Sequence, residues 1–173
     1  RHSDNIFLMK DLQKKFDEYK KKVHSKEGIG EFYERQIRYL YEKNGWRVEP
    51  YGILKGKSDL GRDLICTKKK QVLIIQAKNW SKRKTIHEKH LMQLAGTILY
   101  YIYNKKSFPK GVFVTTAKLS DRAKDVAKKL NIQHRNIKLD KNFPMIKCNI
   151  NKRGKKLFFF PFDKFYDKVH IDI

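Results

Sequence analysis

A carboxylate, an amide and a lysine stand near the ends of two neighbouring strand-like runs, at Asp63, Gln76 and Lys78. If Lys69 and Lys70 form a two-residue hairpin loop between the runs, the antiparallel register sets Asp63 directly opposite Gln76, with both side chains on one face. Lys78 points to the same face because side chains alternate along a strand. The sequence therefore predicts one polar cluster at the end of an otherwise apolar strand pair.

This set of groups can hydrolyse a phosphodiester. Carboxylate and amide oxygens hold a hard cation, which polarises a phosphate and lowers the pKa of water. A lysine can orient that water or offset the negative charge that develops on the phosphate oxygens. The alternative is that Asp63, Gln76 and Lys78 are ordinary polar residues at the ends of buried strands, and the residues alone leave both interpretations open.

Helix and strand patterns alternate around the cluster. The predicted order is a helix over 27–44 that stops at Gly45, strands over 46–51, 60–67 and 71–80, a helix over 88–104, a strand over 111–116, a helix over 120–130 and a short strand near Ile132. The run 72–75 is apolar on both faces, which is typical of a central strand covered on both sides. We therefore expect an α/β fold with a central mixed sheet flanked by helices.

Two flanking segments differ in character from this core. Residues 5–24 place apolar side chains at helical spacing among many lysines, which predicts an amphipathic N-terminal helix. Beyond residue 143, the runs 146–150 and 156–162 predict a hairpin that is followed by 166–173. We therefore divide the chain into an N-terminal helical arm (1–26), a core (27–142) and a C-terminal β appendage (143–173).

The chain is strongly basic, with 41 Lys and Arg against 18 Asp and Glu in 173 residues and a formal net charge of +23. Such an excess attracts polyanions, so nucleic acid is the expected partner, ahead of an anionic membrane surface. No apolar run reaches the roughly 20 residues of a membrane-spanning helix, and no signal peptide opens the chain, so we expect a soluble, cytoplasmic protein. Cys66 and Cys148 lack metal-ligand spacing and are expected to be buried thiols. A start at Arg1 rather than Met favours a longer parent protein with additional domains.

The two strand runs also carry a family resemblance. Gly61-Arg-Asp, a hairpin, and then Ile74-Ile-Gln-Ala-Lys-Asn-Trp80 resemble the catalytic core of Mrr-like restriction endonucleases in the PD-(D/E)xK superfamily. Those enzymes have Gln-x-Lys where most of the superfamily has Glu-x-Lys. The helix opening Gly30-Glu-Phe-Tyr-Glu-Arg35 is similar to the Gly-x-x-x-Glu-Arg opening of archaeal Holliday-junction resolvases and their Mrr-like relatives. The resemblance covers roughly residues 27–132.

This resemblance implies a restriction-endonuclease-like fold of three layers and a metal-dependent DNA endonuclease. It also implies that Glu34, Asp63, Gln76 and Lys78 are the catalytic residues and that the first three hold Mg²⁺, for which Mn²⁺ can substitute. Because Gln76 is neutral, the site contains only two clear anions. We therefore expect weaker metal binding than in a site with three carboxylates, and one bound ion rather than two.

Further residues are expected to contact DNA. They are Asn79 at the end of the catalytic strand, the basic loop residues Lys82, Arg83 and Lys84, and the residues His87, His90 and Gln93 of the next helix, which the resemblance places along the active-site cleft. Contacts of this kind position a duplex without reading its sequence. The alternatives are a solvated charge run for the loop and a structural role for the histidines.

Several questions about function stay open at this level. A catalytically inactive nuclease-fold module that binds DNA, motivated by Gln76, and a junction-resolving nuclease are the alternative functions, and the DNA target can be duplex, branched or modified. Cutting both strands needs two sites, so a homodimer is expected, with Tyr100, Tyr101 and Tyr103 as contact residues. The tail resembles a small β module that follows nuclease domains in some bacterial proteins, which implies a structural or dimer-forming role.

Overall fold

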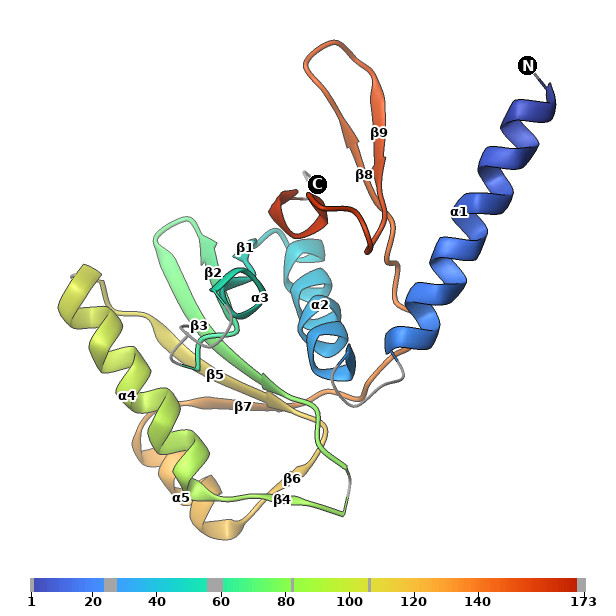
Figure 1. Cartoon of the computed structure of the whole chain (residues 1–173). Helices are drawn as coiled ribbons and strands as arrows, with labels where there is room; N and C mark the ends of the chain where they lie inside the picture. The colour runs from blue at the N-terminus through green and yellow to red at the C-terminus, as the bar shows by residue number, and fades with distance from the viewer. Residues whose placement is uncertain (1, 24–27, 56–60, 82, 106, 171–173) are drawn as a thin grey trace.

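A five-stranded mixed sheet forms the centre of the molecule (Figure 1). The structure is a computed structural model that describes residues 2–23, 28–55, 61–81, 83–105 and 107–170, with side chains from Leu8 onward. The strands follow the order β1 (Arg47–Glu49), β2 (Leu64–Lys68), β3 (Gln71–Lys78), β5 (Lys110–Thr115) and β7 (Gln133–Asn136). The pairs β1–β2 and β2–β3 are antiparallel, and β3–β5 and β5–β7 are parallel. The predicted α/β class and mixed sheet are therefore confirmed.

Helices cover both faces of this sheet. Helix α2 (Gly28–Lys43) lies on one face, and α4 (Glu88–Lys105) and α5 (Asp121–Lys129) lie on the other (Figure 1). The neighbouring residues Ile74 and Ile75 are both fully buried, yet Ile74 packs in the core under α4 and α5, whereas Ile75 packs in the core under α2. Because side chains alternate along a strand, β3 contributes to both cores, which confirms the predicted doubly covered central strand.

The sequence signals for the helix ends agree with the structure. Helix α2 ends at Lys43, and Gly45 follows with a left-handed φ of +76°, which glycine adopts without steric cost. At α5, the Ser120 hydroxyl caps the helix by accepting a hydrogen bond from the Ala123 N–H. These local signals were sufficient because each is satisfied within one turn of the helix.

Three short elements differ from the prediction. A helix, α3 (Tyr51–Lys55), begins at the residue where the first strand was expected to end, and β1 stops at Glu49. Strands β4 (Thr85–Ile86) and β6 (Lys118–Leu119) form a separate parallel pair that was not predicted. Elements of two to five residues carry too little periodicity to identify, and long-range contacts decide them.

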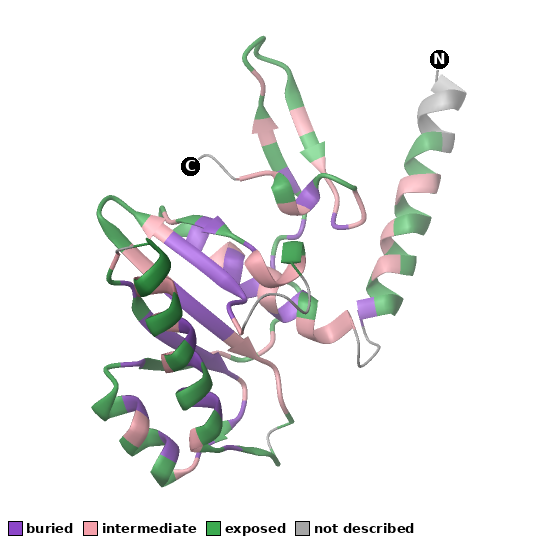
Figure 2. Cartoon of the chain, turned by 60° about the vertical axis from the view of Figure 1, so that its left-hand side comes forward, coloured by how far each residue is buried: buried purple, intermediate pink, exposed green. Residues whose placement is uncertain are grey.

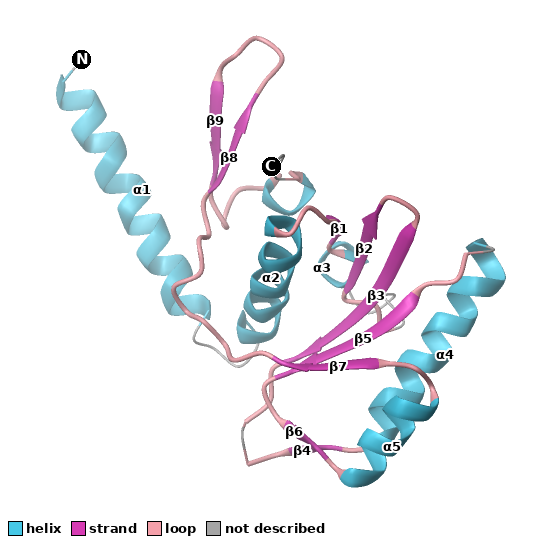
Figure 3. Cartoon of the chain, turned by 180° about the vertical axis from the view of Figure 1, so that it is seen from behind, coloured by secondary structure: helices cyan, strands magenta, loops and turns pink. Residues whose placement is uncertain are grey.

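The flanking segments lie on the side of α2 that faces away from the sheet, as Figure 3 shows from behind. Helix α1 (His2–Val23) confirms the predicted N-terminal helix, and Val23 at its end packs with Phe32 of α2 and with Phe143 and Met145. The tail forms the predicted hairpin from β8 (Lys147–Ile150) and β9 (Lys156–Phe159), followed by a 3-10 helix (Tyr166–Lys168).

A buried ionic network fastens this tail to α2. Arg38 is fully buried, pairs with Glu42 at 2.7 Å, and donates hydrogen bonds to the carbonyl oxygens of Asp167 and Val169. The Lys147 ammonium donates to the carbonyl oxygens of Tyr166 and Val169, and burial together with the nearby Arg38 lowers its pKa to about 7. These buried charges were not predicted from the sequence.

Two predictions about single side chains are wrong. Cys66 is buried as expected, but Cys148 is exposed on the hairpin, because two paired strands with no covering layer leave their faces in solvent. Tyr101 does not share an outer face with Tyr100 and Tyr103, since it packs against the core under α4.

Among the residues that the structure describes, no helix is both long and apolar enough to cross a membrane.

Candidate active site

The β2–β3 hairpin sets the geometry of the site. Lys68 pairs with Gln71 across a two-residue loop, in which Lys69 adopts a left-handed φ of +53°. The pairing of Leu64 with Ile75 confirms the predicted register. Continued by one residue, this register places Asp63 beside Gln76 at the end of the strand pair.

Asp63 is held rigidly at that position. Its backbone N–H donates to the Ile75 carbonyl oxygen at 3.0 Å, and its Oδ2 accepts a hydrogen bond of 2.6 Å from the Ala77 N–H. The side chain is buried although it carries a carboxylate. A buried carboxylate bound to a backbone N–H on one oxygen has a fixed orientation, so its second oxygen, Oδ1, points in a defined direction.

A second carboxylate reaches the same place from α2. An ideal Cβ built on Gly52 of α3 would lie 3.2 Å from Glu34 Oε2 and 3.3 Å from Asp63 Oδ1. The two oxygens are therefore neighbours of one small space that Gly52 leaves open. Helix α3 is held there because the Gly52 N–H donates to the Asp63 carbonyl oxygen at 2.9 Å, and Figure 1 shows α3 between α2 and β2.

Two amide side chains converge on the other flank of Asp63. A Cβ on Gly61 would lie 3.2 Å from the Nε2 of Gln76 and 3.3 Å from the Nε2 of Gln93, which extends from α4. Gly61 also has a φ of +75°, so both its conformation and its surroundings favour glycine. Within the described part of the chain, the buried Oε1 of Gln76 has no hydrogen-bond partner. That orphaned oxygen is suited to accept a ligand.

Lys78 is partly buried and contacts His90 of α4. Its Nζ lies 3.1 Å from the Nδ1 of His90, and 5.2 Å from the ring centroid of Trp80. Burial lowers the pKa of Lys78, while the negative charge of Asp63 acts in the opposite direction. Burial also lowers the pKa of His90, as does the positive charge of Lys78. A neutral His90 ring can accept the proton of the Lys78 ammonium in a hydrogen bond.

The residues expected to contact DNA fall into three groups. His90, which is buried, and Gln93, which is exposed, lie at the site, and Arg83, Lys84 and His87 are also exposed. Lys82 lies outside the described residues. Asn79 turns toward β5, where its Oδ1 accepts a hydrogen bond from the Thr116 hydroxyl. Asn79 therefore has a structural role, since its side chain links the end of β3 to Thr116.

The donor set fits a hard divalent cation. It offers Glu34 Oε2 and Asp63 Oδ1 on one shared space, together with the unbonded Oε1 of Gln76, and all are oxygen atoms. No group of three or more His, Cys, Asp or Glu side chains in the described residues is arranged to hold a metal.

Two further residues shape the site and were not predicted from the sequence. Gly52 creates the space between the carboxylates, but a single glycine after a strand gives no sign of a close approach. Trp80 was quoted only as part of a motif, yet its ring lies between Lys78 and Lys84, whose Nζ atoms are 5.2 and 5.4 Å from the centroid, and packs edge-on against His90. An aromatic residue between lysines was the available signal.

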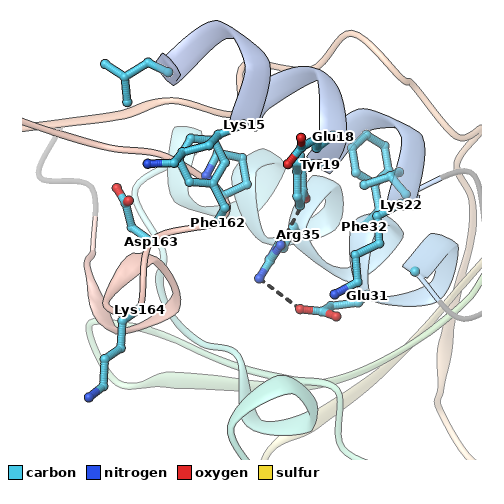
Figure 4. Close-up of a pocket in the computed structure, with 14 residues that line it drawn as sticks. Lys15, Glu18, Tyr19, Lys22, Glu31, Phe32, Arg35, Phe162, Asp163 and Lys164 are labelled. Atoms are coloured by element: carbon cyan, nitrogen blue, oxygen red, sulfur yellow. Dashed lines mark hydrogen bonds and ion pairs between the residues drawn. The ribbon is translucent and has the colours of Figure 1, made fainter. Parts of the chain in front are cut away.

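A separate cavity lies away from these residues. A groove of about 810 Å³ runs between α1, α2 and residues 161–164 and includes none of the predicted site residues (Figure 4). Its central cation, Arg35, pairs with Glu31 at 2.9 Å and with Asp167 at 2.6 Å. Because two carboxylates already match the charge of Arg35, whereas Glu34 and Asp63 converge beside Gly52, we place the site at the strand ends.

Comparison with known proteins defines the class. A family model described as Mrr_cat, restriction endonuclease, matches residues 26–140. The chain belongs to this restriction endonuclease family. Its class is therefore that of a nuclease domain. No curated protein matches the chain.

Three solved structures match part of the chain, and one of them reaches a TM-score of 0.50. The first is described as a protein of unknown function, AF1548, with a TM-score of 0.50 and 18% identity over 60% of this chain and 55% of that chain. EndoMS in its apo form gives a TM-score of 0.37 and 14% identity over 44% of this chain and 32% of that one. A repair endonuclease from Pyrococcus abyssi gives a TM-score of 0.36 and 16% identity over 43% of this chain and 31% of that one. The chain thus spans about half the length of AF1548, or less for the other two.

Proposed function

We propose that this domain is a divalent-metal-dependent DNA endonuclease. The observation that carries the proposal is the convergence of Glu34 Oε2 and Asp63 Oδ1 on the space beside Gly52. Gln76 and Lys78 lie on the adjacent strand. Asp63 is buried and Glu34 is partly buried, and two carboxylates that border one such space repel each other unless a cation lies between them.

The proposed metal ligands are Glu34, Asp63 and Gln76, and Mg²⁺ is the expected ion, with Mn²⁺ as a substitute. When bound, the ion would polarise the phosphate and lower the pKa of water. Asp63 needs no movement to act, since Ala77 fixes one oxygen and leaves the other directed at the shared space.

Lys78 is the proposed electrostatic residue. Burial lowers the pKa of Lys78 and the negative charge of Asp63 opposes that shift, and in its ammonium form Lys78 can offset the charge that develops on the phosphate oxygens. His90 and Trp80 position it, because the ring nitrogen accepts a hydrogen bond while the indole face stabilises the positive charge. Restricting a flexible lysine in this way reduces the entropy lost when substrate binds.

DNA is the proposed substrate because the chain carries a net charge of +23 and exposes Arg83 and Lys84 beside the site. Contacts of lysine and arginine with phosphates release counterions, so affinity should fall steeply with salt. Duplex, branched and modified DNA are all compatible with this geometry. A panel of substrates distinguishes them.

The test is cleavage of a linear duplex, a supercoiled plasmid, a four-way junction and a methylated plasmid in Mg²⁺ or Mn²⁺. Asp63→Ala and Lys78→Ala should abolish cleavage and leave the fold and DNA affinity nearly intact. Asp125→Ala and Lys129→Ala are matched controls, since they alter the same residue types in an exposed ion pair on α5. Loss of DNA binding in parallel with cleavage, or equal effects of the controls, would contradict the assignment.

A second candidate is an inactive nuclease-fold module that binds DNA, which the neutral Gln76 favours. Metal titration separates the two: an inactive scaffold shows no Asp63-dependent binding of Mn²⁺ or Mg²⁺. Under the nuclease proposal, Gln76→Glu adds a third carboxylate and should strengthen metal binding. A junction-resolving nuclease is the further alternative, and preference for the four-way junction in the panel would select it.

We also propose that the enzyme acts as a homodimer, because a cut through both strands requires two sites. The helical arm (1–26) and the β appendage (143–173) are proposed as additions to the nuclease core (27–142).

A further inference from the structure

Helix α4 has apolar side chains on the face that the domain leaves uncovered. Its inner face contributes Leu91 and Leu94 to the core. On its outer face, Met92 is 55%, Leu99 67% and Tyr103 86% exposed. A helix that is apolar all round is normally buried on both sides. Figure 2 shows the outward turns of α4 as exposed.

These residues form one stripe. Positions 92, 96, 99 and 103 follow spacings of four, three and four, which keeps them on one side of an α-helix. Gly96 lies in the middle of the stripe, and a Cβ added there would meet no atom within 4 Å. Glycine is unfavourable inside a helix, so its presence on an open surface suggests that something approaches the backbone there. We define these four residues as the α4 stripe.

The α4 stripe is also the part of this basic chain that suits another copy. From His90 to Asn104 the helix contains no Asp, Glu, Lys or Arg, although charged residues make up 34% of the chain. Two molecules with a net charge of +23 repel each other, and they approach at least cost where charge is absent. DNA, in contrast, has no cation to contact on this stripe.

The stripe is self-complementary under a two-fold axis. If two α4 helices cross antiparallel about a point between Gly96 and Leu99, Leu99 of each copy lies over Gly96 of the other. The same arrangement brings Met92 of each copy against Tyr103 of the other. Such reciprocal pairs are what an isologous dimer interface requires. A large side chain over a glycine allows close helix packing.

We propose that the α4 stripe, with Tyr100 at its edge, is the surface through which two copies of this chain form a two-fold dimer. The proposal rests on the proposed function for its purpose, since it names the contact that would join two nuclease sites. At roughly 200 Å² for a fully exposed side chain of this size, Met92, Leu99, Tyr100 and Tyr103 bury on the order of 500 Å² per copy. The total of about 1,000 Å² reaches the lower limit for a specific interface.

The first experiment measures molar mass by light scattering during size-exclusion chromatography, at tens of micromolar protein and without DNA or metal. Wild type should be a dimer, and Leu99→Glu a monomer, since a buried unpaired carboxylate opposes association. Ile150→Glu is the matched control: it makes the same kind of change at a residue of the β8–β9 hairpin that is 63% exposed. It should remain dimeric. A monomeric wild type, a dimeric Leu99→Glu, or a monomeric Ile150→Glu would each overturn the proposal.

Gly96→Ala provides a test in which two readouts move in opposite directions. The monomer gains helix stability, because alanine has the higher helix propensity and the new methyl meets no atom of its own chain. The dimer loses the notch for Leu99, so its dissociation constant should rise at least about tenfold. A raised melting temperature with unchanged dimer affinity would place the contact elsewhere.

Plasmid cleavage separates a failure of this inference from a failure of the nuclease proposal. A monomeric Leu99→Glu should still nick supercoiled plasmid, while its rate of linearisation falls relative to Ile150→Glu. Cleavage by neither variant nor wild type would contradict the nuclease proposal and leave the measured dimer intact. Linearisation by Leu99→Glu at the wild-type rate would show that the α4 dimer has no part in cutting both strands.

Discussion

Replacing Gly52 with alanine tests whether Glu34 and Asp63 act together. The added Cβ would lie 3.2 Å from Glu34 Oε2, 3.3 Å from Asp63 Oδ1 and 3.2 Å from Asp63 Cα, and each distance is tighter than ordinary van der Waals contact. The Asp63 backbone cannot give way easily, because it is hydrogen-bonded to Ile75 and to Gly52 itself. The carboxylates must therefore move by a few tenths of an ångström.

A displacement of that size is large for the proposed chemistry. Mg²⁺ requires oxygen ligands at about 2.0–2.1 Å in near-octahedral geometry, and changes to groups that orient metal ligands typically cost about 10–100-fold in affinity or activity. We expect Gly52→Ala to lower the single-turnover cleavage rate and Mn²⁺ affinity by that factor. Its free energy of unfolding should fall by about 0–2.5 kcal/mol, because alanine gains about 0.5–1 kcal/mol in a helix while crowding costs about 1–3 kcal/mol.

The assay compares plasmid cleavage, Mn²⁺ titration by calorimetry and urea unfolding. Gly30→Ala is the matched control, because it makes the same change in α2 where a Cβ meets no atom within 4 Å. If Gly52→Ala cuts as fast as Gly30→Ala and binds Mn²⁺ equally well, the two carboxylates do not share a ligand and the proposed site is wrong.

Three further results are expected. Burial and Lys78 lower the pKa of His90 below 6.5, so the unfolded state takes up a proton first as the pH falls. The contribution of neutral His90 to folding stability is therefore complete above about pH 6.5 and is lost below it. Lys78→Ala should raise the pKa of His90 in an NMR titration, and an unchanged titration curve would exclude the contact. Arg38→Ala leaves Glu42 buried without its partner and should lower the free energy of unfolding in urea by about 3–5 kcal/mol. Lys124→Ala, which removes an exposed ion pair, should lower it by less than about 1 kcal/mol. Similar losses for the two variants would contradict the stabilising role of the buried network. DNA affinity should fall by orders of magnitude between about 50 and 200 mM salt in a filter-binding or anisotropy titration, and a flat response would argue against phosphate contacts.

The sequence by itself determined the central architecture. Long periodic segments predicted the helices α2, α4 and α5, and the apolar run in β3 predicted a strand buried on both faces. The hairpin register followed from a two-residue loop, since pairing fixes every later partner once the loop length is known. Placing Asp63 beside Gln76 therefore needed only local information.

Tertiary structure decided what brings the remaining groups to that point. Glu34 and Asp63 border one open space because α3, a five-residue helix without a sequence signature, presents Gly52 there. Lys78 meets His90 because α4 crosses the end of β3. Contacts between residues distant in the chain depend on how whole layers pack, and packing depends on the volumes of many side chains at once. A pattern of spacing fixes which face a residue occupies, and only the packed layers fix what it touches.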